Sequence, residues 1–497
     1  MDERRISAEE YKSYILSHHV KEYEIRQDND DCISLLTDTA VGQVNFYPQD
    51  IVELQIQSKE NEEIIFYLHF QLSDEQHAHE LFQEMVTTLI RQKEEKKIKV
   101  LLTCSSGITT NYFVYLLNDA MTSLNMNFEF AAEDLAKVYT SGFDYDVILL
   151  APQVHHEYDR FKKIFPEQLV LKIPVSVFAT YSAGSLIKMI IEEKKKNDLE
   201  SVHSSETMDL RKPFDNPYRI LSIVMIKYKG QFRFAYRIYD HGKKTLDKEV
   251  IKPSQTFQDI IDLLDYVLAR HENISAIGLA LPGIAYHGYL YHPAYGFTNH
   301  DNIGIFLSEK YKIPVFLIND VNAVALGYYA LHEDSENMVF YYQPRGSAKG
   351  RAGIIINGRL HRGRKSFSGE LSYLTDAVVE DAERKKTTPS GAEEIVRKVL
   401  IGLITTIAPD KIVICSELTP DMDHLRALLR EYLDEQYIPE LVYAARLKEY
   451  MLAGAMIHCL EVITHNDPQL YEDKTIPESD VKKFWSLVDK FSEGGEA

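Results

Sequence analysis

The sequence predicts a multidomain α/β protein, and three observations carry this prediction. At 497 residues the chain is longer than a single hydrophobic core usually organises, so two to four domains are expected. Strand-like apolar runs alternate with helical patterns from residue 97 and again from residue 218, which is typical of α/β domains. A charged stretch with almost no large apolar residues separates these two blocks. We therefore expect an N-terminal module, a first α/β domain, a linker and a second domain, over 1–95, 96–192, 193–217 and 218–497.

Composition and charge argue against several classes of function. No run of about 18 apolar residues is present and the N-terminus MDERRISAEEYKSYI is charged, so neither a membrane span nor a secretory signal is expected. The four cysteines lie far apart without a CxxC pair, which argues against disulfides or a cysteine-rich zinc site and fits a reducing cytoplasm. A net charge of −20 without a local basic patch opposes nucleic-acid binding. We expect a cytoplasmic protein.

The first 95 residues predict a small α+β module. A helix is expected around 8–17, and the runs VGQVNFYP, DIVELQIQS and EEIIFYLHFQL alternate as half-buried strands do. The stretch DEQHAHELFQEMVTTLIRQ then places apolar residues at helical spacing. A DNA-binding helix-turn-helix would need consecutive short helices and basic residues on the second, and neither is present. The pattern assigns no role to this module.

From residue 97 the pattern is strand, turn, helix, strand, with KIKVLLTC, SSGIT, TNYFVYLLNDAMTSL and NFEFAAE. Two further apolar strands are predicted, DVILLAPQ and LKIPVSVFA. Cys104 ends the first strand, directly before the turn. The N-terminus of the following helix offers free N–H groups and a partial positive charge, and both stabilise a thiolate and an attached phosphoryl group. Hydroxyl groups and one glycine complete the predicted phosphate-binding turn: Ser105, Ser106, Gly107, Ile108, Thr109 and Thr110.

Three phosphate motifs compete for this turn, beside the interpretation of Cys104 as a buried core thiol. A Walker A loop needs GK[ST], but no lysine lies between Lys99 and Lys137. A tyrosine phosphatase loop needs arginine six positions after the cysteine, where this chain has Thr110. The remaining pattern, C-x-x-G-x-[ST]-[ST], resembles the active loop of the lactose/cellobiose-type enzyme IIB of the bacterial phosphotransferase system. The resemblance continues through DYDVILLAPQV to about residue 190. It implies that Cys104 accepts a phosphoryl group from a phosphohistidine of enzyme IIA and passes it on towards a sugar.

The C-terminal block carries a second resemblance. Its motifs are LPG ending at Gly283, Asn299 ahead of a helix, NDVNA at 319–323 and AGIIINGRLHRGRKSFSGELSYL at 352–374. Together they resemble the ROK family (repressors, open reading frames and kinases), over about 218–465. The resemblance implies a two-lobed, actin-like ATPase fold. It also implies a sugar site in which Asp320 is the general base and in which Gly283, Asn299, Asn319, Glu370 and Tyr373 take part. The other interpretation of Asn319-Asp320 is a turn at a strand end.

This block departs from the kinases of that family in three places. The phosphate-wrapping DxGGT motif is replaced by ILSIVMIKYKGQF, and the loop GTGIGAG is replaced by SAKGRAG at 347–353. Side chains at glycine positions obstruct backbone approach to phosphate. The zinc motif CxCGxxGCxE is absent, and Tyr373 stands where the family has histidine. We therefore expect no cofactor, neither zinc nor ATP with magnesium, and no ATP-dependent sugar kinase activity.

Together these patterns predict a carbohydrate-sensing regulatory protein. It would be phosphorylated on Cys104 by an enzyme IIA-type donor and would bind a sugar or sugar phosphate in the ROK-like domain. A homodimer is expected. Two alternatives stay open: a ROK-type sugar kinase fused to a phosphocysteine carrier, and a ROK-type transcriptional regulator.

Overall fold

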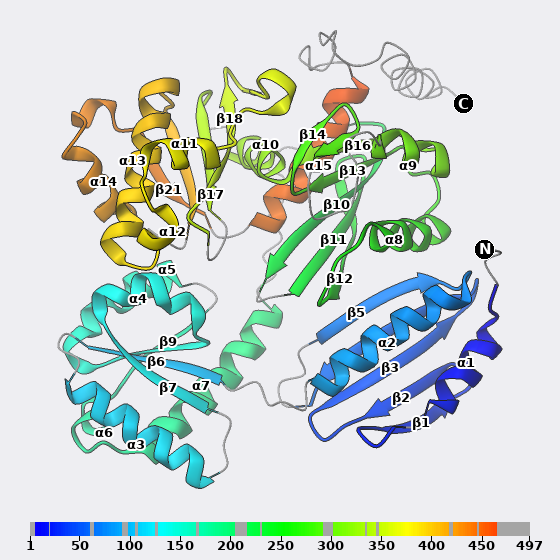
Figure 1. Cartoon of the computed structure of the whole chain (residues 1–497), viewed down its shortest axis with the longest axis horizontal. Helices are drawn as coiled ribbons and strands as arrows, with labels where there is room; N and C mark the ends of the chain where they lie inside the picture. Colours follow the sequence, from blue (N-terminus) through cyan, green and yellow to red (C-terminus); the bar gives the residue numbers. More distant parts are fainter. Residues whose placement is uncertain are drawn as a thin grey trace. The chain divides into compact units, whose positions relative to one another are not determined.

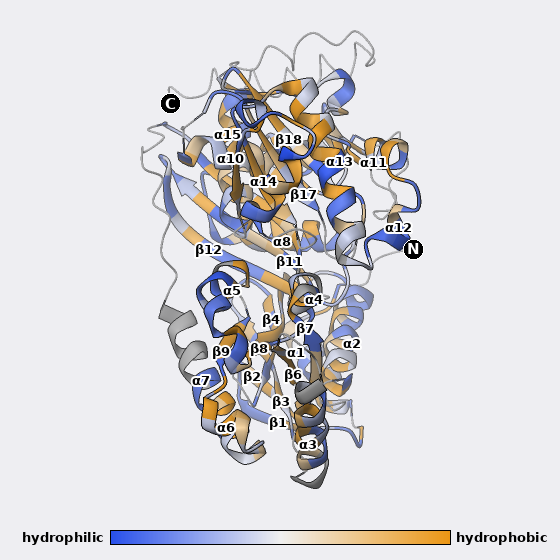
Figure 2. Ribbon diagram, turned by 90° about the vertical axis from the view of Figure 1, so that its left-hand side faces the viewer, coloured by the Kyte–Doolittle hydropathy of each residue, from blue (hydrophilic) through white to orange (hydrophobic). Residues whose placement is uncertain are grey.

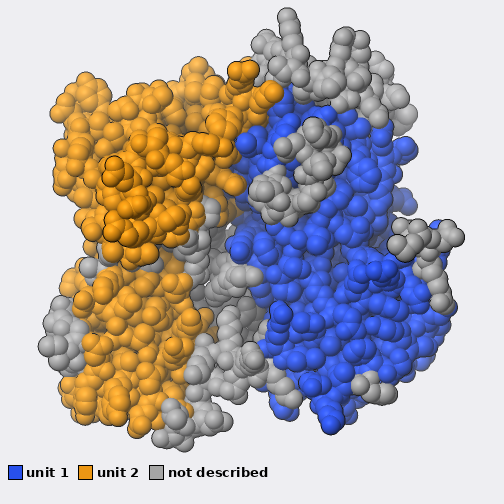
Figure 3. All heavy atoms as spheres, viewed as in Figure 1, with its two compact units in different colours: residues 1–95, 210–331, 448–497 blue, residues 96–209, 332–447 orange. Residues whose placement is uncertain are grey.

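The computed structural model divides the chain into two compact units (Figure 3). Unit 1 comprises residues 1–95, 210–331 and 448–497, and unit 2 comprises 96–209 and 332–447. Each unit is described by itself below. The structure describes residues 5–464 except for 19, 60–63, 92–97, 105–107, 125–127, 166–167, 204–215, 229–230, 292–301, 333–334, 344–346, 417–420 and 445–446.

In unit 1 the N-terminal residues form an antiparallel sheet with two helices, as their alternation predicts (Figure 1). In β3 the residues at alternate positions, from Ala40 to Phe46, are buried, which is the pattern of a sheet with one face on the core. A capping box between Ser7 and Glu10 starts the first helix. The elements are α1 (Ala8–Ser17), β1 (Glu24–Asn29), β2 (Cys32–Leu36), β3 (Ala40–Tyr47), β4 (Ile51–Ser58), β5 (Ile64–Gln71) and α2 (Glu75–Arg91).

The rest of unit 1 is an α/β lobe. Its strands β10, β11 and β12 form an antiparallel meander. Strand β13 pairs in parallel with β10, and β16 pairs in parallel with β13. The elements are β10 (Arg219–Tyr228), β11 (Gln231–Asp240), β12 (Lys243–Lys252), α8 (Phe257–Arg270), β13 (Ala276–Leu281), β14 (Ile284–Tyr286), β15 (Tyr289–Tyr291), α9 (Ile303–Tyr311), β16 (Val315–Asn319), α10 (Asp320–His332) and α15 (Leu447–Ile463).

The two parts of unit 1 share one ten-stranded sheet, in the order β1-β2-β3-β4-β5-β12-β11-β10-β13-β16. Strand β5 meets the edge of β12, where Tyr67 pairs with Ile251. Beside this pair the Gln231 side chain donates a hydrogen bond to the Ile65 carbonyl at 2.9 Å. The buried core is continuous across the seam between β5 and β12. Residues 1–95 therefore extend the sheet of the α/β lobe.

Unit 2 begins with a four-stranded parallel sheet, in the order β7-β6-β8-β9. The run LKIPVSVFA was expected as one strand, but its strand ends at Lys172 and Val175–Ala179 form a short helix after Pro174. The last helix continues to His203, into the stretch expected as a linker. The elements are β6 (Ile98–Cys104), α3 (Ile108–Leu124), β7 (Phe128–Asp134), α4 (Leu135–Ser141), η1 (Gly142–Asp144), β8 (Val147–Leu150), η2 (Pro152–Glu157), α5 (Tyr158–Ile164), β9 (Leu169–Lys172), α6 (Val175–Ala179) and α7 (Ala183–His203).

The second part of unit 2 is a five-stranded mixed sheet with helices, in the order β19-β18-β17-β20-β21. Figure 2 colours the residues by hydropathy and shows hydrophilic residues along much of strand β12 of unit 1, whose first seven residues are exposed or half-buried. The elements are β17 (Met338–Gln343), β18 (Arg351–Ile356), β19 (Arg359–Leu360), η4 (Arg364–Ser366), α11 (Ser372–Val378), α12 (Ala382–Lys385), α13 (Pro389–Ile407), β20 (Lys411–Ser416), α14 (Met422–Arg430), η5 (Glu435–Tyr437) and β21 (Glu440–Tyr443). The α/β multidomain class expected from the sequence is confirmed.

Candidate functional site

Cys104 is the last residue of β6, at the carboxyl edge of the parallel sheet. The chain leaves β6 towards β7 on one side, and the next strand, β8, lies on the other side of β6. Such a point, where the order of strands reverses, is where open α/β sheets bind ligands. The Cys104 side chain is only 3% exposed. The topology therefore places the thiol at the usual position of a binding site.

Among the residues that the structure describes, Thr110 brings a hydroxyl group into contact with the thiol of Cys104. The Sγ atom of Cys104 and the Oγ1 atom of Thr110 share a short hydrogen bond, and Thr110 is fully buried in the first turn of α3. The helix begins at Ile108, four residues after the cysteine, so the unpaired N–H groups of its first turn follow closely after the thiol in the chain. Of the other residues predicted for this turn, Ile108 and Thr109 belong to the same helical turn, while Ser105, Ser106 and Gly107 lie outside the described residues.

Two further strand ends complete this edge of the sheet. Ala151, after β8, donates its N–H to the Thr103 carbonyl at 3.0 Å and is fully buried. The imidazole of His155 in η2 lies 3.0 Å from the carbonyl of Ile173, which follows β9. This contact ties the two loops together beside the thiol edge. His155 was not singled out from the sequence, because a histidine in a polar loop gives no periodic signal.

Exposed apolar side chains also mark this domain. Tyr112 and Tyr115 on α3 are 55% and 67% exposed, and Val175 at the start of α6 is 66% exposed. The ring of Tyr112 meets that of Tyr181 edge to face, with 5.4 Å between centroids. Sequence reasoning missed these tyrosines, although they lie off the buried stripe of α3 formed by Phe113, Leu117 and Met121. Apolar exposure of this kind is typical of a surface that docks a protein partner.

In unit 1 the structure brings together Gly283, Asn319 and Asp320. The Asn319 amide donates to the Gly283 carbonyl at 2.7 Å, and its Oδ1 accepts the N–H groups of Val321 and Asn322, each at 3.0 Å. Gly283 has a φ of 117°, which favours glycine. Asn319 thus caps the start of α10 and fixes the turn after β13. These contacts agree with the interpretation of Asn319 as part of a turn at a strand end.

Asp320 is the first residue of α10 and is 8% exposed. Its Oδ1 accepts the N–H of Val321 at 2.9 Å. Like the Asn319 side chain, this carboxylate lies at the N-terminus of α10, the positive end of the helix dipole. A nearly buried carboxylate at this position has the chemistry of a general base. Asn299 lies outside the described residues.

Unit 2 holds the other two residues predicted for the sugar site. Glu370 is half-buried and follows Gly369, whose φ is +87° and whose added Cβ would overlap the Ala352 carbonyl oxygen. Tyr373 in α11 is 66% exposed, and its ring centroid lies 5.3 Å from that of Phe367. The five described sugar-site residues are thus divided between the two units.

The two segments that replace kinase phosphate loops are ordinary structural elements here. Strands β10 and β11 pair without interruption from Arg219 opposite Asp240 to Tyr228 opposite Gln231, and Val224 is fully buried. In the second segment, Lys349 forms an ion pair with Asp376 at 2.7 Å, and a Cβ at Gly350 would lie 2.7 Å from the Tyr341 ring. Over their described residues, neither segment forms a glycine-rich turn.

Within the described part of the chain, no group of three or more His, Cys, Asp or Glu side chains is placed to hold a metal ion. Over the same residues, no helix is long and apolar enough to cross a membrane.

Family comparisons agree with the two motifs. Residues 99–187 match the family of the PTS system, Lactose/Cellobiose specific IIB subunit, and residues 229–380 match the ROK family. The chain therefore contains a IIB domain and a ROK domain, and both resemblances seen in the sequence are confirmed. Residues 1–95 lie outside both matches.

Characterised relatives of the ROK part have two kinds of function. The chain is 28% identical over 131 residues to the xylose repressor of Bacillus spizizenii, covering 25% of this chain and 33% of the repressor. It is 26% identical over 164 residues to the N-acetylglucosamine repressor of Shigella flexneri, covering 29% and 38%. It is 30% identical over 125 residues to a glucokinase of Halalkalibacterium halodurans, covering 24% and 37%. Each alignment spans well under half of the relative's length.

Solved structures similar to the chain include a ROK family protein and a IIB domain. One is a ROK family protein from Streptococcus pneumoniae in complex with sucrose, with 20% identity, a TM-score of 0.40, and coverage of 50% of this chain and 99% of that chain. Another is the lactose-specific IIB component domain from Streptococcus pneumoniae, with 20% identity, a TM-score of 0.19, and coverage of 20% and 98%.

Proposed function

We propose that this protein is a carbohydrate-responsive regulator that receives a phosphoryl group on Cys104. The observation that carries the proposal is the position of this thiol, at the switch point of a parallel sheet and in contact with Thr110 at a helix start. The IIB family match supports a phosphoryl donor of the phosphotransferase system as partner.

In the proposed step, the sulfur of Cys104 attacks the phosphorus of a phosphohistidine on an enzyme IIA-type protein. The S–P bond forms, the P–N bond breaks, and the released imidazole takes up the thiol proton. The Thr110 hydroxyl and the N–H groups of the first turn of α3 are suited to donate hydrogen bonds to the phosphoryl oxygens. The exposed tyrosines of α3 offer a surface for the donor protein.

We further propose that the ROK domain binds a sugar or sugar phosphate without transferring phosphate from ATP. Asp320 and the turn at Gly283 support sugar binding, and relatives named for xylose and N-acetylglucosamine support a regulatory role. The unbroken β10–β11 ladder and the loss of glycines at 347–353 oppose a phosphate cradle for ATP. A homodimer is part of the same proposal.

The second candidate is a sugar kinase fused to its phosphoryl carrier. The buried carboxylate of Asp320 at the start of α10 favours it, because kinases that phosphorylate sugar hydroxyls need such a base, and one relative is a glucokinase. A third candidate, a transcriptional regulator, is favoured by the two relatives named as repressors.

The deciding experiment uses the full chain with radiolabelled phosphoenolpyruvate, the general phosphotransferase proteins and a lactose/cellobiose-type enzyme IIA. Label should enter the wild-type protein and be absent from Cys104→Ser. The matched control is Cys32→Ser, which removes a half-buried thiol on β2 of unit 1 and should leave labelling unchanged. Label retained in Cys104→Ser would overturn the carrier role. ATP-dependent phosphorylation of hexoses that is lost in Asp320→Asn would establish the kinase instead.

A further inference from the structure

A cavity of about 410 Å³ lies on unit 1, and its lining includes neither Cys104 nor any residue of the ROK sugar site. Three structural elements supply its lining. Tyr236 comes from β11, Leu246 and Lys248 come from β12, and Tyr266, Arg270 and His271 come from α8 and the residue after it. Its volume is within the range of small-molecule sites. No sequence motif pointed to it, because its residues are spread over 36 positions of the chain.

The charges around this cavity are unbalanced. Lys248 and Arg270 are exposed cations, and among the described residues neither forms an ion pair with a carboxylate. The nearby carboxylate, Glu53, is already hydrogen-bonded by the Tyr67 hydroxyl at 2.6 Å and by Asn45 at 3.2 Å. The pKa of His271 is lowered, mainly by burial and then by the positive charges of Arg219, Lys248 and Arg270. An anion is therefore the ligand that this surface lacks.

Arg270 is held in place by aromatic rings. Its guanidinium lies 5.2 Å from the centre of the Tyr47 ring and 4.8 Å from that of Tyr266, and it donates to the Tyr266 hydroxyl at 3.1 Å. Cation–π contacts of this kind orient the guanidinium without neutralising its charge. Several of its five N–H donors stay available, in a planar fork that matches a phosphate group.

The wall of the cavity is rigid. The imidazole of His69 stacks on Tyr266 with 3.5 Å between ring centroids, and its Nε2 lies 3.4 Å from the Tyr236 hydroxyl. Burial, with Lys248 and Arg270, lowers the pKa of His69 to about 3, so this imidazole is neutral at pH 7. These contacts fix Tyr266, which is 4% exposed, beside the nitrogen groups of Lys248, Arg270 and His271, and this arrangement suits a small ligand carrying a phosphate.

We propose that this cavity binds a small phosphorylated compound of about the size of a hexose monophosphate. Lys248, Arg270 and His271 would hold the phosphate, and Leu246 and the small exposed part of Tyr266 would contact the body of the ligand, while Tyr236 is fully buried behind them. The site depends on the N-terminal module, because Tyr47 on β3 and His69 on β5 hold Arg270 and the tyrosines. Residues 1–95 thereby gain a role in positioning the residues that line a ligand site. This proposal is independent of the proposed function of Cys104 and of the ROK sugar site.

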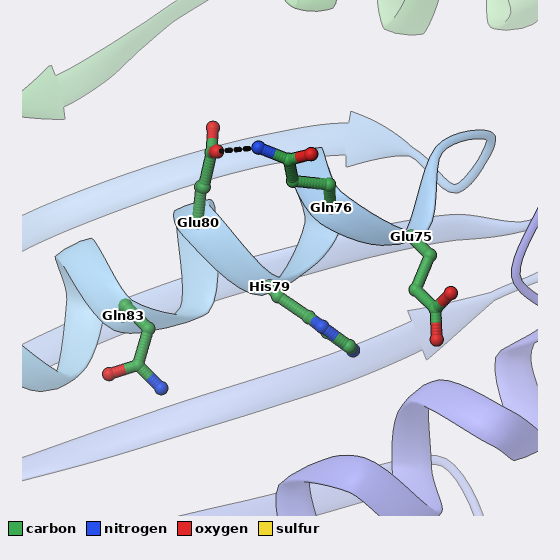
Figure 4. Close-up of a pocket in the computed structure, with 5 residues that line it drawn as sticks. All are labelled: Glu75, Gln76, His79, Glu80 and Gln83. Carbon is green, nitrogen blue, oxygen red and sulfur yellow. Dashed lines mark hydrogen bonds between the residues drawn. The ribbon is translucent and has the colours of Figure 1, made fainter. Parts of the chain in front are cut away.

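The larger cavity of unit 1, about 480 Å³ along α2, does not share these features (Figure 4). Its lining includes the carboxylates Glu75 and Glu80, the latter bonded to Gln76. His79 stacks on Tyr14 of α1, and Gln83 donates to the hydroxyl of the same tyrosine at 3.0 Å. Two of its five lining residues, His79 and Gln83, thus join α2 to α1, and Gln76 and Glu80 bond each other.

The test is titration calorimetry of the full-length protein with glucose 6-phosphate, glucose and inorganic phosphate. We expect saturable binding of glucose 6-phosphate, weaker binding of phosphate, and none of glucose at this site. Arg270→Gln and Lys248→Gln should each weaken binding of glucose 6-phosphate about 10-fold or more, because each removes a charge-assisted hydrogen bond. The matched control is Lys243→Gln, which removes a lysine from the other end of β12 and should leave the affinity unchanged.

Asp320→Asn separates the two sites, because it weakens only a binding event at the ROK sugar site, whereas the event at this cavity is the one that Arg270→Gln and Lys248→Gln should weaken. Equal affinity in wild type, Arg270→Gln and Lys248→Gln would overturn the proposal, as would loss of binding in Asp320→Asn alone. Failure of glucose 6-phosphate and phosphate to bind wild type at millimolar concentration would also overturn it. A circular dichroism spectrum of each variant shows whether the fold is retained.

Discussion

Lys252, the last residue of β12, places its ammonium group 2.8 Å from the Glu84 carboxylate of α2, and it forms a second ion pair with Asp259 of α8. The lysine is only 4% exposed. Burial disfavours its charge, but Asp259 and Glu84 outweigh the burial and raise the pKa of Lys252. One buried cation thus joins the N-terminal module to the α/β lobe of unit 1.

Replacing this lysine should loosen the module. Lys252→Met leaves the carboxylates of Glu84 and Asp259 facing a buried site without their cation. Removing one partner of a buried ion pair typically costs about 3–5 kcal/mol of stability. We expect amide exchange in α2 and β5 to speed up by two orders of magnitude or more, as hydrogen–deuterium exchange would measure. Lys243→Met on the same strand is the control and should change exchange little. Unchanged exchange in Lys252→Met would contradict a structural role for the ion pair.

The junction should also respond to pH through His77. This imidazole on α2 lies 2.8 Å from Asp262 of α8, and the hydrogen bond to that carboxylate raises the pKa of His77 against the opposing effect of burial. A raised folded-state pKa stabilises the folded form below the unfolded value of about 6.5, and this stabilisation is lost as pH rises through the folded-state pKa. We expect α2 to be better protected at pH 6 than at pH 8.5.

The pH effect is measured by hydrogen exchange of α2, corrected for intrinsic rates. His77→Gln should abolish the difference in protection between the two pH values. His241→Gln, on an exposed turn outside this contact, should preserve it. A difference that persists in His77→Gln would assign the effect to another group.

Thr110 should assist phosphorylation of Cys104 without accepting phosphate itself. Thr110→Val removes the hydroxyl that meets Sγ while keeping the shape of the side chain. A hydrogen bond to a charged group contributes about 1.5–3 kcal/mol, so we expect the rate of labelling to fall about 10- to 100-fold. Thr110→Ser keeps the hydroxyl and should retain most of the rate. Equal labelling of all three proteins would remove Thr110 from the site.

Two glycines should control the packing of α10, the helix that carries Asp320. A Cβ at Gly327 would overlap the carbonyl oxygen of Tyr450, and one at Gly454 would overlap that of Ala323. Because both neighbours are backbone atoms, they cannot move aside without separating α10 from α15. We expect Gly327→Ala and Gly454→Ala each to destabilise unit 1 by about 1–3 kcal/mol or more.

Thermal unfolding would report this loss as a lower transition temperature. The control is Gly184→Ala on α7, where the added methyl group meets no atom within 4 Å. Alanine is also the better helix former, so this change should be neutral or stabilising. A transition temperature unchanged in Gly454→Ala would show that the helices do not pack as closely as described.

The local structural features of this protein could be predicted from its sequence. Strand alternation located β3, β4 and β5, the helical spacing located α2, and the turn chemistry after Cys104 indicated a phosphoryl site before any fold was known. These features follow from side-chain periodicity and from helix termini, which depend only on residues close in sequence. The IIB and ROK domains could be predicted for the same reason, because their motifs are short and contiguous.

Tertiary structure alone decided which distant segments meet. The pairing of Tyr67 with Ile251 joins residues 184 positions apart, and a strand shows the same alternation whatever strand it pairs with. The contact of Arg270 with Tyr47 likewise depends on how α8 packs, so neither residue carried a signal in the sequence. Asn319 shows the converse, because its motif indicated a sugar contact while its amide atoms bond the backbone at Gly283, Val321 and Asn322. Periodicity specifies which face of an element is buried, but only the folded chain specifies what buries it.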